Sequence, residues 1–170
     1  MVIVNGYKHI KNTFKAEFKN QDIVAKSRIA GWKDMPVVAK LEKPTNVARA
    51  RELGYKAKQG VFVARVRVER GLSKRQKTKG GRKPSKSGRF FAYSNSLKSI
   101  AEGRAARRFN NCEVLNSYYI GEDAKYKFFE AIMLDRSHPS VLNDKVYSVV
   151  VSRKGRAFRG LTKAGRKHRN

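Results

Sequence analysis

Apolar and polar residues alternate along two stretches in the first half of the chain, and this period of two is typical of half-buried β-strands. The first stretch covers residues 36–42 and is closed by Pro44. The second covers residues 61–70 and places small or β-branched residues on one face and charged residues on the other. The apolar face consists of Ala64, Val66 and Val68, and the charged face of Arg65, Arg67 and Glu69.

Two further strand-like stretches, residues 113–120 and 126–135, lie close together in the sequence. The residues between them begin with Gly121, Glu122 and Asp123, which are common in turns. The pattern therefore predicts a β-hairpin with its turn at residues 121–123.

Helical spacing occurs in three places. A short helix is predicted from Thr45, which can cap it, to residue 53, with Gly54 as the left-handed stop. A longer helix is predicted to begin at Ser94 or Ser96, with a packed face made by Leu97, Ala101, Ala105 and Phe109 and a cationic face made by Arg104, Arg107 and Arg108. Residues 7–28 predict one amphipathic N-terminal helix with Ile10, Phe14 and Phe18 on its apolar face. We expect that helix to dock on the core, and a direct contact with RNA stays open.

The element order predicts an α+β fold, with a small antiparallel sheet and packed helices in the order strand, helix, strand, helix, strand, strand. A long basic loop and a basic terminal extension complete this architecture. We divide the chain into an N-terminal helical segment, residues 1–35, a core, residues 36–144, which contains the basic loop 71–89, and a C-terminal basic extension, residues 145–170.

Composition adds an unusual charge to this picture. The chain of 170 residues has 40 Lys and Arg against 13 Asp and Glu, a formal net charge of +27. Seventeen of these cations lie in two acid-free stretches, nine in residues 70–89 and eight in residues 153–170. A free domain with this charge repels itself, which indicates a polyanionic partner such as a nucleic acid.

Other classes of protein find little support. Cys112 is the only cysteine, no Cys or His cluster has zinc spacing, and no cofactor motif is present, so we expect no disulfide, metal, cofactor or small-molecule substrate. No apolar run approaches the roughly 20 residues of a membrane span, and no secretory signal is evident, which predicts a soluble intracellular protein. The three histidines are widely separated and pair with no evident nucleophile.

The cations fall where a nucleic-acid backbone can meet them. In the basic loop a Lys or Arg occurs at nearly every second or third position, and Gly80, Gly81 and Gly88 permit close approach to phosphates. The alternatives for this loop are a solvated charged loop and a nuclear-import signal. The candidate RNA-binding residues are Lys56, Lys58, Lys74, Arg75, Lys77, Lys79, Arg82, Lys83, Lys86, Arg89, Arg104, Arg107, Arg108, Arg153, Lys154, Arg156, Phe158, Arg159, Lys163, Arg166 and Lys167.

RNA is favoured over DNA because no helix-turn-helix, zinc finger or basic zipper is recognisable, whereas long basic tracts suit the irregular surfaces of structured RNA. We expect residues 153–170 to be disordered until RNA is bound, since eight cations and no acid leave little to fold around. Several aromatic residues lie beside cations, and core packing is the favoured interpretation for all except Phe158, which has no apolar pattern around it. The aromatic residues concerned are Tyr55, Phe62, Phe90, Phe91, Tyr93 and Phe158.

Two rival functions are weighed against RNA binding. Asp123 and Lys125, with Glu130 nearby, resemble part of a metal-dependent nuclease signature, but the same residues suit a turn and a strand with ion pairs. A DNA-compacting protein is the second rival, because its charge would be similar. We favour a binding protein without enzymatic activity.

Several segments resemble a known family. The segment 50–60, Ala-Arg-Glu-Leu-Gly-Tyr-Lys-Ala-Lys-Gln-Gly, is similar to the signature of the archaeal and eukaryotic large-subunit ribosomal proteins of the fifteen-e family. The similarity continues through residues 79–84, 115–119, 121–123, 126–130 and 155–162, and residues 7–10 resemble the family's opening. Ala48 stands where the family usually has an acid, and Tyr119 where it often has Trp. The chain also lacks the long tail of eukaryotic members, which suggests an archaeal-like or reduced form.

The resemblance implies an α+β unit embedded in large-subunit rRNA and in contact with neighbouring ribosomal proteins. It implies a structural role, in the cytoplasmic large ribosomal subunit, in which the core positions two basic segments on RNA. No membrane partner is implied.

Overall fold

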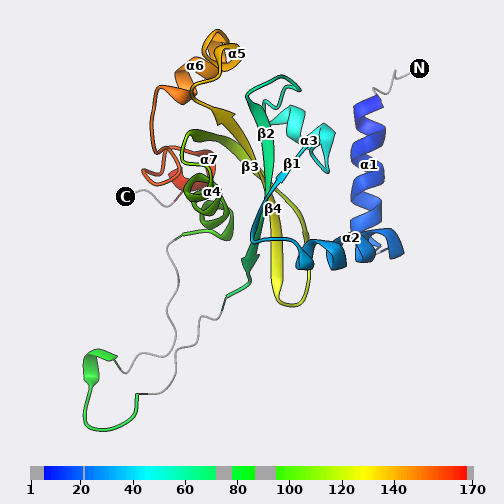
Figure 1. Cartoon of the computed structure of the whole chain (residues 1–170). Coiled ribbons are helices and arrows are strands. Elements are labelled where there is room, and N and C mark those ends of the chain that lie inside the picture. The colour runs from blue at the N-terminus through cyan, green and yellow to red at the C-terminus, as the bar shows by residue number, and fades with distance from the viewer. Residues whose placement is uncertain (1–5, 21, 72–77, 87–94, 168–170) are drawn as a thin grey trace.

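The computed structural model describes residues 6–20, 22–71, 78–86 and 95–167 (Figure 1). In chain order the elements are α1 (Gly6–Lys19), α2 (Ile23–Asp34), β1 (Val38–Leu41), α3 (Val47–Glu52), β2 (Val61–Glu69), the 3₁₀ turn η1 (Pro84–Lys86), α4 (Leu97–Arg108), β3 (Cys112–Glu122), β4 (Tyr126–Asp135), α5 (Pro139–Leu142), α6 (Lys145–Val151) and α7 (Lys163–Arg166). The predicted α+β class is confirmed. Within the described residues, no helix is long and apolar enough to cross a membrane.

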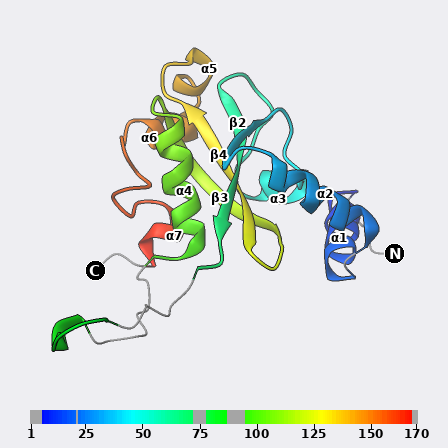
Figure 2. The same cartoon turned by 60° about the horizontal axis from the view of Figure 1, so that its bottom comes forward.

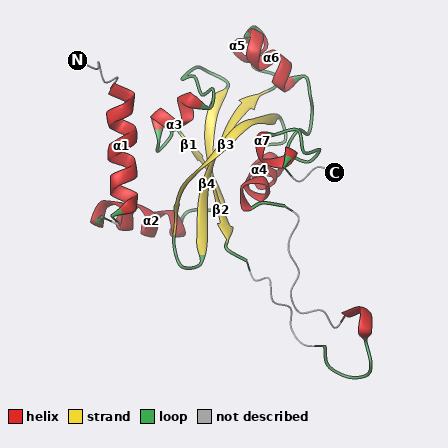
Figure 3. Cartoon of the chain, turned by 180° about the vertical axis from the view of Figure 1, so that it is seen from behind, coloured by secondary structure: helices red, strands yellow, loops and turns green. Residues whose placement is uncertain are grey.

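The four strands form one antiparallel sheet in the order β1-β2-β4-β3. The strands and the hairpin predicted from alternation are therefore confirmed. Figure 3 shows helices on both sides of this sheet, with α1 to α3 on one side and α4 and α7 on the other. The turn of the hairpin lies later than predicted, because Gly121 and Glu122 belong to β3 and the Asp123 amide donates to the Tyr126 carbonyl at 2.8 Å.

One face of the sheet packs against α2, α3, α5 and α6. Trp32 of α2 lies with its ring 5.4 Å from that of Phe128 in β4, and Tyr147 of α6 is buried in the same cluster. The charged face predicted for β2 is wrong for Arg65, which is only 8% exposed because Trp32 covers it at 4.5 Å. The division at residues 35/36 and 144/145 stays a prediction, although this cluster draws residues from all three segments.

The other face of the sheet packs against α4. Ala64, Val66 and Val68 of β2 meet Ala101 and Ala105 of α4, as the alternation and the helical spacing predicted. The helix begins at the second of the two candidate caps, since the Ser96 hydroxyl accepts a hydrogen bond from the Ser99 amide at 3.2 Å. Small residues on this helix face allow it to lie close to the sheet.

The N-terminal segment is two helices, so the prediction of one helix over residues 7–28 is wrong. The chain turns after Lys19, and α2 begins after Asp22, a residue type that favours helix starts over helix interiors. Phe18 of α1 stacks on Trp32 at 6.2 Å. Lys11 forms an ion pair with Glu52 of α3 at 2.6 Å. The helix therefore docks on the core, as expected.

The helix α3 is capped by a different residue from the one predicted. The Asn46 side chain accepts a hydrogen bond from the Arg49 amide at 2.9 Å, while Thr45 donates to the buried Glu130 instead. The predicted left-handed stop is confirmed, because Gly54 has φ +97°.

Candidate nucleic-acid interface

A groove lies between α4 and the C-terminal segment, including α7. Figure 2 shows α4 and α7 side by side. Its volume is about 600 Å³. None of the described residues that line it is acidic, and three are arginines. The lining residues are Asn95, Ser99, Ile100, Gly103, Arg104, Arg107, Ala157, Phe158, Arg159, Gly160 and Gly165. We call it the arginine groove.

One wall of the arginine groove is a loop fixed by a buried acid from β3. Glu113 is 4% exposed, and its carboxylate accepts hydrogen bonds from the amides of Gly155 at 2.7 Å and Arg156 at 3.2 Å. The Arg156 guanidinium donates to the Val114 carbonyl at 2.7 Å. Glycine is required at residue 155, where φ is +71°. Arg156, predicted to contact RNA, is thus occupied in holding the loop.

The end of the same segment is held by a second buried acid, Glu102 of α4, which is 0% exposed. The Thr162 hydroxyl donates to it at 2.5 Å, and the Ser117 hydroxyl of β3 donates as well. Burial raises the pKa of Glu102, and the two hydroxyl groups and the nearby Lys98 and Arg156 oppose the rise. Thr162 also caps α7 through the Gly165 amide at 3.1 Å.

For residues 153–167, which the structure describes, these contacts correct the expectation that the segment has nothing to fold around without RNA. Residues 168–170 lie outside the described residues. The segment itself has no acid, but Glu102 and Glu113 reach it from the core. Its described cations are exposed except for Arg156, which is half-buried. The exposed ones are Arg153, Lys154, Arg159, Lys163, Arg166 and Lys167.

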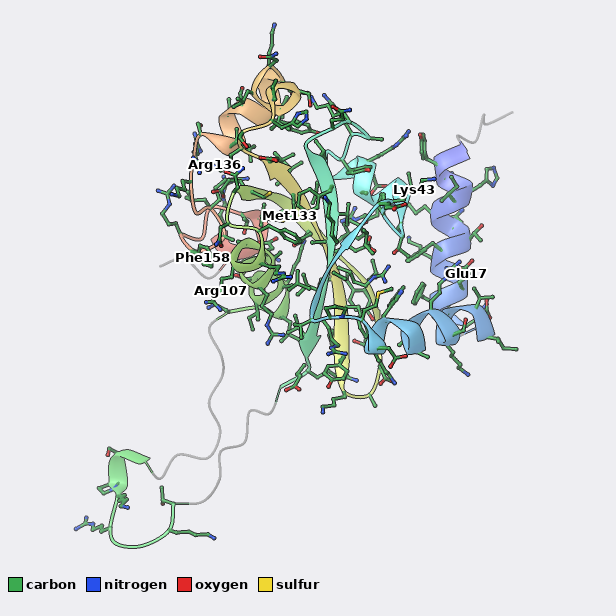
Figure 4. The ribbon with its side chains drawn as sticks, in the orientation of Figure 1. Glu17, Lys43, Arg107, Met133, Arg136 and Phe158 are labelled. Carbon is green, nitrogen blue, oxygen red and sulfur yellow. The ribbon has the colours of Figure 1, made fainter. Side chains whose placement is uncertain are left out.

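The three arginines of α4 have separate roles, although the helical spacing predicted one shared face. Arg104 is partly buried and donates to the Arg67 carbonyl of β2 at 2.8 Å. Arg107 is exposed and lies over the ring of Phe158, 5.7 Å from its centroid. Figure 4 labels both residues on the same side of the molecule. Arg108 is exposed. Of these three arginines, Arg104 and Arg107 line the arginine groove, and Arg107 lies against Phe158 of the C-terminal segment.

Of the six aromatic residues beside cations, the three that the structure describes divide as predicted. Tyr55 is 8% exposed in the core, and Phe62 packs edge to face on Phe109 at 5.0 Å. Phe158 is 54% exposed. Phe90, Phe91 and Tyr93 lie outside the described residues.

Lys56 and Lys58, also predicted to bind RNA, contact an acid of the protein. Their ammonium groups lie 3.1 and 2.8 Å from Asp144, the residue before α6. Both also lie over the ring of Tyr147, at 5.3 and 4.8 Å. These lysines hold the pKa of Asp144 well below its usual range, with help from the amides of Val146 and Tyr147. We call this group the Asp144 cluster.

The basic loop is described only in part. Residues 78–86 lie apart from the sheet and its helices in Figure 1, and Lys79, Arg82 and Lys83 are exposed. Gly80 and Gly81 have positive φ, +71° and +63°, which agrees with a chain that bends sharply. Lys86 ends η1. Lys74, Arg75, Lys77 and Arg89 lie outside the described residues, and their contact with RNA stays a prediction.

The acids of the nuclease hypothesis have separate partners. Glu130 is 0% exposed and accepts hydrogen bonds from Thr45 and Tyr118, with Arg65 3.6 Å away. Asp123 pairs with Lys33 at 2.7 Å. Among the described residues, no group of three His, Cys, Asp or Glu side chains is placed to hold a metal ion.

Sequence reasoning missed the acids that organise this surface. Glu102 and Glu113 carry no motif. The available signal is their position, Glu102 next to Ala101 on the packed side of a predicted helix and Glu113 at the start of a predicted strand. Asn95 and Ser99, which line the arginine groove, are not among the residues predicted from the sequence. Their polarity at the N-terminus of α4 was the available signal.

Comparison with known proteins first establishes the class. A family model described as Ribosomal L15 matches residues 5–170, nearly the whole chain. The chain is thus similar to ribosomal proteins over its core and over both basic segments.

Individual relatives then establish the family. The large ribosomal subunit protein eL15 of Thermoplasma volcanium is 47% identical over 177 aligned residues, covering 99% of this chain and 88% of the relative. Those of Picrophilus torridus and Metallosphaera sedula are 46% and 41% identical, covering 98% and 99% of this chain and 88% and 79% of the relatives. The chain belongs to the eL15 family of large-subunit ribosomal proteins, which confirms the resemblance found in the sequence.

Proposed function

We propose that this protein is a structural component of the large ribosomal subunit that binds and stabilises large-subunit rRNA through its basic loop and its C-terminal segment. The observation that carries the proposal is the arginine groove, whose described lining has three arginines and no acid. Cations without carboxylate partners gain most from phosphates, because releasing the condensed counterions of RNA favours binding. Its proposed location is the large ribosomal subunit of the cytoplasm.

The proposed work is binding and not catalysis. The core holds the two basic segments at separate places, so that phosphates of adjacent RNA segments are neutralised together. Neighbouring large-subunit proteins are further proposed partners. The rival functions predict other behaviour: a nuclease would cleave RNA in a metal-dependent manner, and a DNA-compacting protein would prefer duplex DNA to folded rRNA.

The test measures affinity for large-subunit rRNA over a series of salt concentrations. In the variant, residues 71–88 are replaced by a Gly/Ser segment of the same length, so that the cations are lost while the chain stays long enough to connect β2 to α4. If the loop makes about five phosphate contacts, the slope of log affinity against log salt should fall by roughly 4.

A matched control keeps the same residues of the loop in scrambled order. It should retain most of the slope if the loop acts through charge. An unchanged slope in the Gly/Ser variant would mean that the loop is only solvated. Cleavage of rRNA by the intact chain with Mg²⁺, or preferential binding to duplex DNA in competition, would support one of the rivals.

A further inference from the structure

Phe158 is an exposed aromatic residue on a loop that hydrogen bonds attach to the core. About half of its surface is accessible, at 54%, while the loop that carries it is hydrogen-bonded on both sides. The Phe158 amide donates to the Gly155 carbonyl at 3.1 Å, and the Leu161 amide to the Arg156 carbonyl at 2.9 Å. With Glu113 holding the start of this loop, the ring is presented in advance of any partner.

The surroundings of the ring suit a planar, anionic ligand. Arg107 lies over the ring at 5.7 Å, and the ring edge lies close to α4, since a Cβ added at Gly103 would be 3.9 Å from its Cε1 atom. Arg159, the next residue, also lines the groove. Asn95 and Ser99 add an amide and a hydroxyl group to the same lining, which are able to hydrogen-bond to the edge of a base.

Phosphate alone does not account for this composition. An arginine rim binds phosphates, but an aromatic ring inside the rim gains nothing from them. In an A-form duplex the base faces are stacked on one another, so the ring can only meet a base that is unpaired. Base stacking on an aromatic side chain is a recurrent way to bind such a nucleotide.

We propose that the arginine groove binds one unpaired nucleotide of RNA, with its base stacked on Phe158 and its flanking phosphates at Arg107 and Arg159. This inference rests on the proposed rRNA-binding function and specifies the ligand of one site. Arg156 and Glu113 are positioning residues, because they hold the loop and are not among the residues that line the groove.

The experiment compares Phe158→Leu, Phe158→Trp and the unchanged full-length protein in binding to large-subunit rRNA over a salt series. Leucine keeps an apolar side chain but cannot stack, so affinity should fall by about 5- to 140-fold, the range for losing one stacked base. The salt slope should stay the same, since no charge is removed. Phe158→Trp should bind as tightly as the original protein or more tightly.

Tyr119→Leu serves as the matched control, because Tyr119 is a similarly exposed aromatic residue, at 48%, and is not in the groove. It should leave affinity for rRNA unchanged. Thermal melting of each variant should show that the fold is kept, as expected for a change at an exposed side chain.

Three results would overturn the inference. Affinity of Phe158→Leu equal to that of the original protein would show that no base is stacked there. A loss of affinity accompanied by a smaller slope would assign the effect to phosphate contacts. Unchanged rRNA affinity with lost incorporation into large-subunit particles would assign the groove to a protein partner. Failure of the proposed function itself is distinguishable, because the unchanged protein would then bind rRNA with no steep salt slope.

Discussion

The arginine groove and the Asp144 cluster use their cations in different ways, although the sequence predicts RNA binding for both sets. In the Asp144 cluster, Lys56 and Lys58 lie within 3.1 Å of a carboxylate and beside a tyrosine ring. In the groove, Arg107 and Arg159 line a cavity without an acid, next to an exposed phenylalanine. The lysines join α6 to the loop before β2. Among the described residues Arg107 and Arg159 have no carboxylate partner, and Arg159 donates to the Lys154 carbonyl at 2.7 Å.

The difference teaches that the number of cations does not measure the strength of an RNA site. A cation already paired with a carboxylate has to give up that pair before it gains from a phosphate, and the gain is correspondingly smaller. The acids of the protein thus select which cations face RNA. Glu113 contributes in another way, since it binds backbone amides and leaves Arg159 without a carboxylate partner in the groove.

The largest effect is expected from two double variants, one that removes two cations from the arginine groove and one that removes two from the Asp144 cluster. Arg107→Gln with Arg159→Gln should lower the salt slope of rRNA binding by about 1.4 to 1.8, at 0.7 to 0.9 for each phosphate contact. Lys56→Gln with Lys58→Gln should lower the slope by less than half as much. Filter binding to large-subunit rRNA between low and high salt measures both slopes.

The two double variants should rank in the opposite order when thermal stability is measured. The lysine double variant should melt at a lower temperature, because Asp144 loses both ion pairs, while the arginine double variant should melt unchanged or higher, since like charges are removed. Equal slopes for the two variants would break the comparison, as paired and unpaired cations would then contribute alike.

Local patterns in the sequence predicted the sheet and α4, because alternation and helical spacing are properties of neighbouring residues. They failed where the answer depended on distant ones. Arg65 looked solvent-facing on its strand, but Trp32 from α2 covers it. The sequence predicts one helix over residues 7–28, but α1 ends at Lys19 and α2 begins at Ile23 and packs its Trp32 on Phe18.

In the candidate site, too, local patterns predicted some features, and contacts between distant residues decided the others. Phe158 was singled out correctly as the aromatic residue without a core pattern, and its exposure agrees. The roles of the cations were not predictable, because Lys58 and Asp144 are 86 residues apart and Gly155 and Glu113 are 42 apart. The sequence alone does not distinguish a lysine that pairs with a carboxylate from an arginine that lines the groove.

A middle-sized effect is expected from Glu113→Gln, which loosens the wall of the groove without touching a cation. The change leaves one buried amide without its carboxylate acceptor, which costs about 1 to 3 kcal/mol. The melting temperature should fall by roughly 2 to 4 °C for each kcal/mol in a chain of this size. Differential scanning calorimetry measures this loss.

The direction in which Glu113→Gln changes the affinity for rRNA distinguishes an electrostatic effect from an effect of loop position. Glu113→Gln raises the net charge by one, so a purely electrostatic surface should bind rRNA more tightly. We expect weaker binding instead, because the loop that presents Phe158 and Arg159 loses its anchor. Glu69→Gln is the matched control, since it removes the same charge at an exposed position. Tighter binding by both variants would mean that the position of the loop is irrelevant.

The smallest effect is expected from Asp144→Asn, which frees Lys56 and Lys58 without removing them. Affinity for rRNA should rise slightly, and stability should fall at neutral pH, since the lysines hold the pKa of Asp144 below its ordinary value of 3.8. A lowered pKa in the folded state stabilises the protein above the ordinary pKa, and this stabilisation is lost as the pH falls through the lowered value. The difference in melting temperature between the original protein and the variant should therefore be constant near pH 7 and shrink below about pH 4.

Asp34→Asn, at an exposed position at the end of α2, should show no such difference. A gap that persists unchanged into strong acid would mean that Asp144 acts through its helix-capping geometry and not through its charge, which would leave Lys56 and Lys58 as available to RNA as the groove arginines.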